Sequence, residues 1–248
     1  MKTRDRIANA FGYSLINRSK DHKLYETHLI NVLKRYQINC IFDVGANRGQ
    51  YGLLLRSLGY KGRIISFEPV KATFEALSSV SAKDPLWDVY PFALGNEDTV
   101  KIIKVIKNSD LSSFLKPNNA LDHMFSAGGS EVEREESVAV RRLDTVFTEI
   151  SSASGLAGRF ALKMDTQGYD LEVFRGAVKT LEKIAVLQSE IANVPLYQGV
   201  PDLLTALSIY LQQGFEITGL FPESRDMDDL RVIEFNCLMV HKHLKGDT

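Results

Sequence analysis

One short segment of the sequence, Asp43-Val44-Gly45-Ala46-Asn47-Arg48-Gly49, combines residue types that bind ligands. It follows an apolar run of strand length and opens a helix, and Gly45 allows the backbone to turn sharply and to approach a ligand closely. Such bends usually bind phosphate, which Asp43 would repel. The segment also lacks the G-x-G-x-x-G of dinucleotide sites and the G-K-[ST] of a P-loop. It therefore predicts a ligand without a phosphate at this position.

A second acidic residue, Glu68, ends the next strand along the chain, and Pro69 holds it in an extended conformation. An acidic residue at that place typically accepts hydrogen bonds from the two hydroxyls of a ribose. Together with Asp43 it indicates a ligand with an adenosine half and a cationic, amino-acid-like half, as in S-adenosylmethionine (SAM). The simpler alternative is that Asp43 only caps the helix that follows.

Strands and helices alternate along most of the chain, which predicts an α/β fold. Near-continuous apolar strands between helices indicate a parallel sheet that is covered on both faces. Two closing strands joined by a short acidic turn favour an antiparallel hairpin at the sheet edge. We expect strands over 40–45, 62–69, 87–95, 159–168, 185–193, 215–222 and 231–242, and helices over 47–59, 73–80, 169–183 and 201–214.

An amphipathic helix is predicted ahead of the main domain. The apolar side chains of residues 22–36 fall on one helical face. We therefore divide the chain into an N-terminal helical segment, 1–38, which packs on the core, and a single domain, 39–248. Such a helix could also form a contact between two copies of the chain, so a homo-oligomer stays open.

The middle of the chain departs from the alternating pattern. Strands predicted over 99–108 and 137–147 flank a polar loop that is longer than most connections, and we expect an inserted β-hairpin with a long loop at about 99–143. His123 in this loop is a candidate general base that could swing over the site. A solvated side chain is the more common role of a histidine in such a loop.

Five blocks of the sequence resemble, in the same order, the FkbM family of SAM-dependent methyltransferases. They are "FDVGANRGQYGLLLRSLGYKGRIISFEP", "PFALGNED", "VRRLDTV", "LKMDTQGYDLEVFRGA" and "SEIANVPLYQG", and the resemblance covers roughly residues 20–245. It implies a class I, Rossmann-like methyltransferase fold with a seven-stranded, mostly parallel sheet in the order 3-2-1-4-5-7-6, whose last strand is antiparallel. It also implies O-methyl transfer, often to a sugar hydroxyl of a natural product or glycan.

The resemblance also assigns roles to individual residues. The cofactor-binding residues that it implies are Asp43, Gly45, Ala46, Asn47, Gly49, the ribose-binding Glu68, Ala93 and Leu94 beside the adenine, and Asp165. Asp165 and Glu190 match the family's acidic positions after strands four and five. A sugar hydroxyl is weakly acidic and needs a base or a metal, so we expect Asp165 to contact the acceptor hydroxyl and Glu190 to assist.

Other roles for these two carboxylates stay open. They could share a Mg²⁺ ion through their oxygens, although we predict no metal site. Asp165 could instead cap the helix that follows it, and Glu190 could bond loop amides.

The composition limits the partners and the location. A formal net charge of -1 provides no basic excess, so we expect no nucleic acid as a partner. The acceptor that the resemblance implies is a small molecule or a glycan. Cys40 and Cys237 lie in apolar runs and are expected to be buried free thiols. The sequence shows no signal-peptide pattern and no run of membrane-spanning length, so the cytoplasm is the expected location.

Two other functions fit parts of the sequence. A non-catalytic SAM-binding or scaffold domain would keep the glycine segment, but a decayed enzyme would be expected to lose some of the loop residues, Asp165 or Glu190. An NAD-linked oxidoreductase shares the acidic residue after the second strand but requires the missing G-x-G-x-x-G. A SAM-dependent O-methyltransferase is therefore the leading interpretation.

Overall fold

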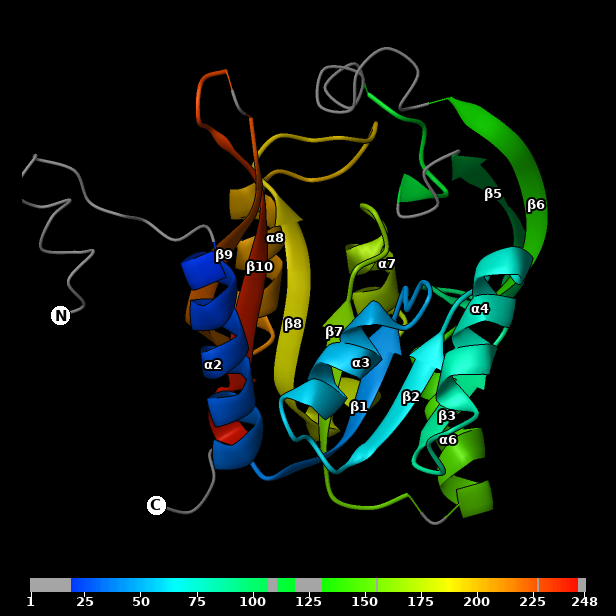
Figure 1. Cartoon of the computed structure of the whole chain (residues 1–248), viewed down its shortest axis with the longest axis vertical. Helices are drawn as coiled ribbons and strands as arrows, with labels where there is room; N and C mark the ends of the chain where they lie inside the picture. Colours follow the sequence, from blue (N-terminus) through cyan, green and yellow to red (C-terminus); the bar gives the residue numbers. More distant parts are fainter. Residues whose placement is uncertain (1–18, 107–110, 119–130, 155, 227, 245–248) are drawn as a thin grey trace, which may run out of the picture.

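A seven-stranded sheet forms the centre of the molecule (Figure 1). The computed structural model describes residues 19–106, 111–118, 131–154, 156–226 and 228–244. In sheet order the strands are β3 (Trp87–Tyr90), β2 (Arg63–Phe67), β1 (Ile38–Val44), β7 (Arg159–Met164), β8 (Ile184–Ala192), β10 (Val232–His241) and β9 (Phe215–Arg225).

The pairing of the strands confirms the predicted class I methyltransferase fold. β1 pairs in parallel with β2 and β7, and β2–β3 and β7–β8 are parallel as well. β10 is antiparallel to both β8 and β9, which makes the expected C-terminal hairpin. The carboxyl ends of the parallel strands therefore meet at one edge of the sheet, where ligands bind in folds of this type.

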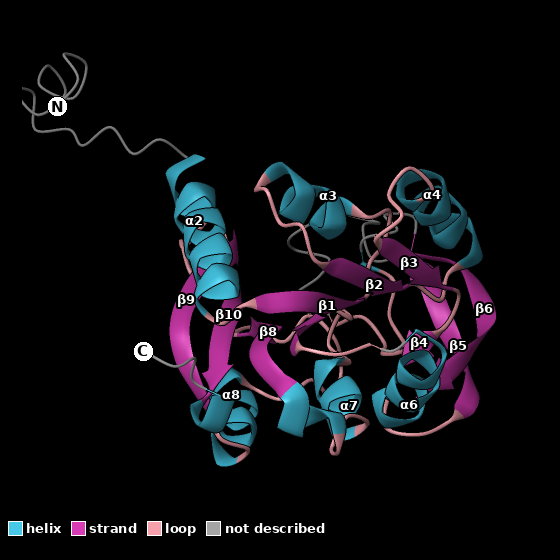
Figure 2. Cartoon of the chain, turned by 90° about the horizontal axis from the view of Figure 1, so that it is seen from below, coloured by secondary structure: helices cyan, strands magenta, loops and turns pink. Residues whose placement is uncertain are grey.

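Helices cover the sheet on both faces (Figure 2). One face carries α2 (Ser19–Arg35), α3 (Gln50–Ser57) and α4 (Lys71–Ser81), and the other carries α6 (Leu143–Ser154), α7 (Asp170–Arg175) and α8 (Leu203–Gln212). The short 3₁₀ helices are η2 (Thr180–Lys183) and η3 (Lys242–Leu244). Two layers of helices explain why the central strands read as continuous apolar runs.

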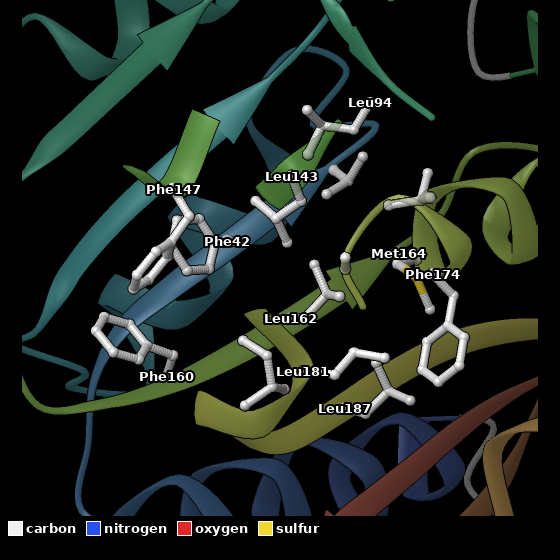
Figure 3. Packing of buried hydrophobic residues seen from close by; sticks show 14 of the residues in the cluster. Phe42, Leu94, Leu143, Phe147, Phe160, Leu162, Met164, Phe174, Leu181 and Leu187 are labelled. Carbon is white, nitrogen blue, oxygen red and sulfur yellow. The ribbon is translucent and has the colours of Figure 1, made fainter. Parts of the chain in front are cut away.

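Neighbouring residues of one strand face opposite cores because side chains alternate across a sheet. Ile41 belongs to the cluster under α2, α3 and α4, whereas Phe42 belongs to the cluster under α6, α7 and α8. In the second cluster the ring of Phe42 lies 5.9 Å from that of Phe147 and 5.8 Å from that of Phe160, between centroids (Figure 3). Cys40 and Cys237 are buried and free, as predicted.

The inserted hairpin is also confirmed. β5 (Thr99–Ile106) and β6 (Val132–Arg141) are antiparallel, and β6 pairs in parallel with β4 (Ala93–Leu94) to form a second, three-stranded sheet. In Figure 1 the hairpin rises beyond α4, at the edge where the parallel strands end.

Four element predictions were wrong in their extent. The strand expected over 159–168 ends at Met164, because the chain turns through the positive φ angles of Gln167 and Gly168. The strand expected over 87–95 is two separate strands, β3 and β4. The strand expected over 137–147 ends at Arg141, because Asp98 accepts hydrogen bonds from the backbone N–H of Arg142 (2.9 Å) and the hydroxyl of Thr145 (3.0 Å), and α6 begins there.

The helix expected over 169–183 is likewise interrupted. α7 ends at Arg175, and the chain turns past Gly176, where a Cβ atom would lie 1.8 Å from the carbonyl oxygen of Gly95. Asp144 then accepts hydrogen bonds from the backbone N–H groups of Lys179 (3.0 Å) and Thr180 (2.9 Å), and η2 follows. A tertiary contact and a distant carboxylate thus override a continuous helical pattern.

The helix predicted near the N-terminus packs on the sheet as α2. Tyr25, Leu29 and Leu33 are buried in the cluster that also contains Ile41 and Val240. The division of the chain at residue 38 stays a prediction. In the described part of the chain, no helix is both long and apolar enough to cross a membrane.

Candidate active site

A cavity of about 390 Å³ opens at the edge where β1, β2, β7 and β8 end. This volume lies within the range of small-molecule sites. The lining comes from the loop after β1, the residues after β2, β4, the segment 111–118, the loop after β7, and the facing surfaces of α2, β9 and β10. The predicted site residues lie around this one space, with exceptions given below.

The loop after β1 forms the floor of the cavity. The backbone N–H groups of Gly45 and Ala46 both donate to the carbonyl oxygen of Phe67, at 3.1 Å each, and Asn47 follows in a left-handed conformation with φ of 48°. Gly45 has φ of 73°, and a Cβ atom there would lie 1.9 Å from the backbone oxygen of Asp165. Only glycine therefore lets the loops after β1 and β7 meet.

Glu68 is nearly buried and is held by backbone donors. Its Oε2 accepts a hydrogen bond from the N–H of Asn47 (3.0 Å), and its Oε1 accepts one from the N–H of Val70 (2.9 Å). Burial raises the pKa of the Glu68 carboxyl to about 7, against the effect of these two hydrogen bonds. Glu68 lines the cavity, where a carboxylate can accept further hydrogen bonds from a diol.

An apolar wall continues from Glu68 along β4 and the inserted hairpin. Its side chains are those of Val70, Ala93, Leu94, Ile103 and Phe114. The ring of Phe114 lies against that of Tyr169, with 4.8 Å between centroids, and Lys101 donates to the Tyr169 hydroxyl at 3.0 Å. A flat, apolar ring fits such a wall.

A row of three charged side chains joins the ends of β1 and β7. Lys163 Nζ is 3.1 Å from Asp43 Oδ1 and 3.4 Å from Asp165 Oδ2, and it donates to the Gly45 carbonyl at 3.3 Å. Burial disfavours the Lys163 cation, but Asp43 and Asp165 outweigh that effect, and the pKa of Lys163 is raised. Of the three, Asp165 and Lys163 line the cavity.

Asp43 itself is shielded from the cavity. Its side chain has 0% exposure, its Oδ2 accepts a hydrogen bond from Ser66 Oγ at 3.0 Å, and it is not among the lining residues. Lys163 offsets the charge of Asp43, so any attraction of Asp43 for a cationic ligand acts only over a distance. Gly49, which precedes α3 with φ of 91° and faces Leu77 and Trp87, does not line the cavity either.

The two candidate catalytic carboxylates are brought together by an amide. Gln167 Nε2 donates to Asp165 Oδ1 at 3.1 Å and to Glu190 Oε2 at 3.2 Å. Burial, together with the nearby charges of Asp165 and Glu234, raises the pKa of Glu190 well above that of an ordinary glutamate. The third candidate, His123, lies outside the described residues.

The wall opposite the loop after β1 is a chain of polar side chains. Tyr51 donates to Gln188 Oε1 at 3.0 Å, and Gln188 Nε2 donates to the hydroxyl of Tyr25 (2.7 Å) and to Asn236 Oδ1 (3.1 Å). Asn236 Nδ2 in turn donates to Glu223 Oε2 at 2.5 Å. This wall joins α2, α3, β8, β9 and β10, and all five residues line the cavity.

Sequence reasoning missed several residues of the site. A signal was present for two of them, because Lys163 and Gln188 are polar residues inside the apolar runs "RFALKM" and "AVLQSE". A buried polar residue in a central strand needs a partner, and in this fold it finds one at the site. For Gln167, Glu223 and Asn236 the pattern held no comparable signal. Within the described ranges, no three His, Cys, Asp or Glu side chains are arranged to hold a metal ion.

Comparison with known proteins places the chain in a family. A family model, the methyltransferase FkbM domain, matches residues 43–217. No protein of curated function matches the sequence significantly.

Three solved structures of methyltransferases resemble the chain distantly. An rRNA methylase from Streptococcus thermophilus has 10% identity and a TM-score of 0.44, covering 92% of this chain and 99% of its own. Aeropyrum pernix fibrillarin with natively bound SAM has 11% identity and a TM-score of 0.43, covering 88% of this chain and 74% of its own. A human methyltransferase 10 domain containing protein has 8% identity and a TM-score of 0.45, covering 92% of this chain and 83% of its own. At these values they do not indicate an acceptor. The family match covers more than half of the sequence, and the chain belongs to the FkbM family of SAM-dependent methyltransferases.

Proposed function

We propose that the protein transfers the methyl group of SAM to a hydroxyl of a sugar-like acceptor, with Glu190 as the general base. The observation that carries the proposal is the position of Glu190 at the cavity, half-buried, with a raised pKa and with Oε2 held by Gln167. A carboxylate with a raised pKa is a stronger base and accepts a proton from a hydroxyl more readily than an ordinary carboxylate does.

The cavity residues fit the cofactor. Glu68 is nearly buried and suits the ribose hydroxyls, the apolar wall of Val70, Leu94 and Phe114 suits the adenine, and the carboxylate of Asp165 suits the cationic end. When bound, SAM supplies a methyl group on a positively charged sulphur, which is a good leaving group. The protein must then hold the acceptor oxygen in line with that methyl group and remove its proton.

Glu190 is better placed than Asp165 for this proton. Both oxygens of Asp165 have partners, because Oδ1 accepts from Gln167 and Oδ2 faces Lys163 at 3.4 Å. Glu190 Oε2 accepts from Gln167, whereas Glu190 Oε1 has no hydrogen-bond partner in the described part of the chain. We therefore assign the proton transfer to Glu190 Oε1 and the orientation of the acceptor and of the cofactor's cationic end to Asp165.

The polar side chains of the cavity favour a neutral, hydroxyl-rich acceptor over a polyanion. The described lining holds one cation, Lys163, and it is paired with Asp43. Carboxylates lie on several sides of the space, with the amides of Gln188 and Asn236 between them. Carboxylates accept hydrogen bonds from hydroxyls, and amides both accept from and donate to them, whereas a phosphate backbone requires Lys and Arg contacts.

A methyl-transfer assay with defined acceptors tests the proposal. The purified protein is incubated with SAM and a panel of methyl glycosides, and both S-adenosylhomocysteine and O-methylated glycoside are measured by mass spectrometry. We expect at least one glycoside to be methylated by the wild-type protein and none by Glu190→Gln. A short RNA duplex and single strand serve as the competing acceptor class.

Three results would contradict the proposal. Methylation of RNA but of no glycoside would overturn the acceptor class. Undiminished turnover by Glu190→Gln would remove Glu190 as the base. SAM binding by calorimetry without any methylated product would favour a SAM-binding domain without this activity.

A further inference from the structure

Gln167 has a backbone conformation that its residue type rarely adopts. Its φ is 52°, in the left-handed region that disfavours residues with a Cβ atom. Such a residue persists only when its surroundings hold it there. The next residue, Gly168, also has a positive φ, of 89°, so the chain after β7 makes a tight turn that directs the Gln167 side chain between β7 and β8.

The Gln167 amide can bind only one way round. Its two carboxylate partners, Asp165 and Glu190, both face Nε2, which has two hydrogens to donate. Its Oε1 accepts a hydrogen bond from the Tyr197 hydroxyl at 3.0 Å. A reversed amide would put Oε1 against two ionised carboxylates, which have no hydrogen to donate, so the network determines the orientation.

Residues 111–118, in the inserted segment, also help to hold Gln167 in place. Ser113 Oγ donates to the Gln167 carbonyl at 2.8 Å, and the Tyr197 hydroxyl lies 2.8 Å from the carbonyl oxygen of Leu111. The segment that contains Leu111 and Ser113 continues to Pro117, which forms a β-bridge with Tyr197. Three parts of the chain that are distant in sequence therefore meet at this one residue.

Glu190 lies among like charges, which makes a donor beside it important. The carboxylates that face it come from the loop after β7 (Asp165), α7 (Asp170), β9 (Glu223) and β10 (Glu234), and the cation Lys163 lies on β7. A hydrogen bond donated to an ionised carboxylate favours that form and opposes the repulsion between neighbouring carboxylates. One amide that donates to two carboxylates does this for both at once.

We propose that Gln167 is the positioning residue of the methyl-transfer site: its amide holds Asp165 and Glu190 side by side and leaves Glu190 Oε1 for the acceptor hydroxyl. This inference rests on the proposed role of Glu190 as the base. In this role Gln167 acts on the reaction through the two carboxylates, to which its amide donates directly.

The test replaces the amide by an apolar side chain of similar size. Gln167→Leu removes both donors and keeps a Cβ atom at the same backbone position. The matched control is Gln37→Leu, because Gln37 also has φ of 52° but is exposed and lies at the turn between α2 and β1, away from the cavity. A difference between the two variants therefore reports the amide and not the backbone conformation.

The first measurement does not need an acceptor. In protein labelled with ¹³C at the glutamate carboxyl carbon, the Glu190 resonance is assigned by its loss in Glu190→Gln and is titrated with pH. We expect Gln167→Leu to raise the pKa of Glu190 by about one unit, the shift that corresponds to loss of a hydrogen bond to a charged group. Gln37→Leu should leave the titration unchanged. An unchanged Glu190 titration in Gln167→Leu would overturn the proposal.

The second measurement uses a glycoside that the wild-type protein methylates. We expect Gln167→Leu to lower kcat by about 100-fold, the cost of a misplaced catalytic group, and to retain its affinity for SAM. The pH at which kcat rises should move to a higher value, because the pKa of Glu190 is higher in this variant. An unchanged kcat in Gln167→Leu would contradict the positioning role. If no glycoside is methylated but the Glu190 titration shifts as expected, the sugar acceptor fails while the pairing by Gln167 stands.

A second variant covers the case in which Gln167→Leu does not fold. Tyr197→Phe removes the hydroxyl that orients the amide and keeps the buried ring. We expect a smaller rise in the pKa of Glu190 in the same direction. A Glu190 titration identical to that of the wild-type protein in Tyr197→Phe would then count against the proposal.

Discussion

The two ends of the cavity hold their key carboxylates in different ways. At the β1–β2 end (Asn47, Glu68 and Val70), Glu68 accepts hydrogen bonds from two backbone N–H groups. At the β7–β8 end (Asp165, Gln167 and Glu190), both carboxylates accept from one side-chain amide. Backbone donors remain whatever side chains surround them, whereas a side-chain donor can be removed by one substitution. We therefore expect the hydrogen bonds to Glu68 to persist when neighbouring side chains are substituted. Those to Asp165 and Glu190 should be lost when Gln167 alone is substituted.

The largest effect is expected from the β7–β8 end. Glu190→Gln keeps the size of the side chain but removes its capacity to take a proton. With a glycoside that the wild-type protein methylates, kcat should fall by about 10²- to 10⁴-fold, the usual contribution of a general base, while SAM affinity is unchanged. Steady-state kinetics and calorimetry measure the two quantities. The exposed Glu182→Gln is the control, and equal losses in both variants would refute a specific role for Glu190.

A second substitution should disturb both ends together. Lys163→Met leaves the buried Asp43 without its cation and frees the Gly45 carbonyl and Asp165. Breaking a buried ion pair from one side costs about 3–5 kcal/mol of the free energy of unfolding, which urea denaturation measures. Adding Asp43→Asn should restore most of that loss, because no unpaired buried charge then remains. Equal stability of the single and double variants would mean that the ion pair is not what Lys163 contributes.

The β1–β2 end can be tested through cofactor binding alone. Glu68→Ala removes the proposed acceptor of the ribose hydroxyls, and loss of hydrogen bonds to a charged group should weaken SAM binding by about 10- to 100-fold. Turnover at saturating SAM should change much less, in contrast to Glu190→Gln. Calorimetric titration checks the affinity, with the exposed Glu75→Ala as the control. A fall in kcat without a fall in affinity would reverse the assignment of the two ends.

The smallest effect is a pH dependence of that affinity. The pKa of Glu68 is about 7, and the ionised carboxylate is the better acceptor for hydroxyl donors. SAM binding should therefore be strongest above pH 7 and weaken as the pH falls through 7, to about a tenth of its strength at pH 6 relative to pH 8. Glu68→Gln, which cannot ionise, should bind with a flatter pH profile. A wild-type affinity that rises as the pH falls would contradict this sign.

The comparison of the two ends also explains which parts of the site could be predicted. Gly45 and Glu68 belong to a strand–turn–helix and a strand end, where residue type and position carry the information. Gln188, by contrast, bonds to Asn236 and Tyr25, which lie 48 and 163 positions away. Sequence patterns of period two or near four do not contain such pairs. The same limit explains the wrong extents of the predicted strand at 137–147 and helix at 169–183, both of which end at tertiary contacts.

By itself the sequence determined the family, the alternating α/β pattern and the inserted hairpin, since these depend on local motifs and on hydrophobic periodicity. The order of the strands was implied by the resemblance to the family and not by the periodicity. Only the tertiary structure decided that Asp43 is shielded by Lys163 and that Gln167 joins Asp165 to Glu190. The physical reason is that burial and charge pairing depend on which side chains the register of β1, β7 and β8 brings together. A carboxylate at the end of a strand can be read from the sequence, but whether it faces the cavity or a buried lysine cannot.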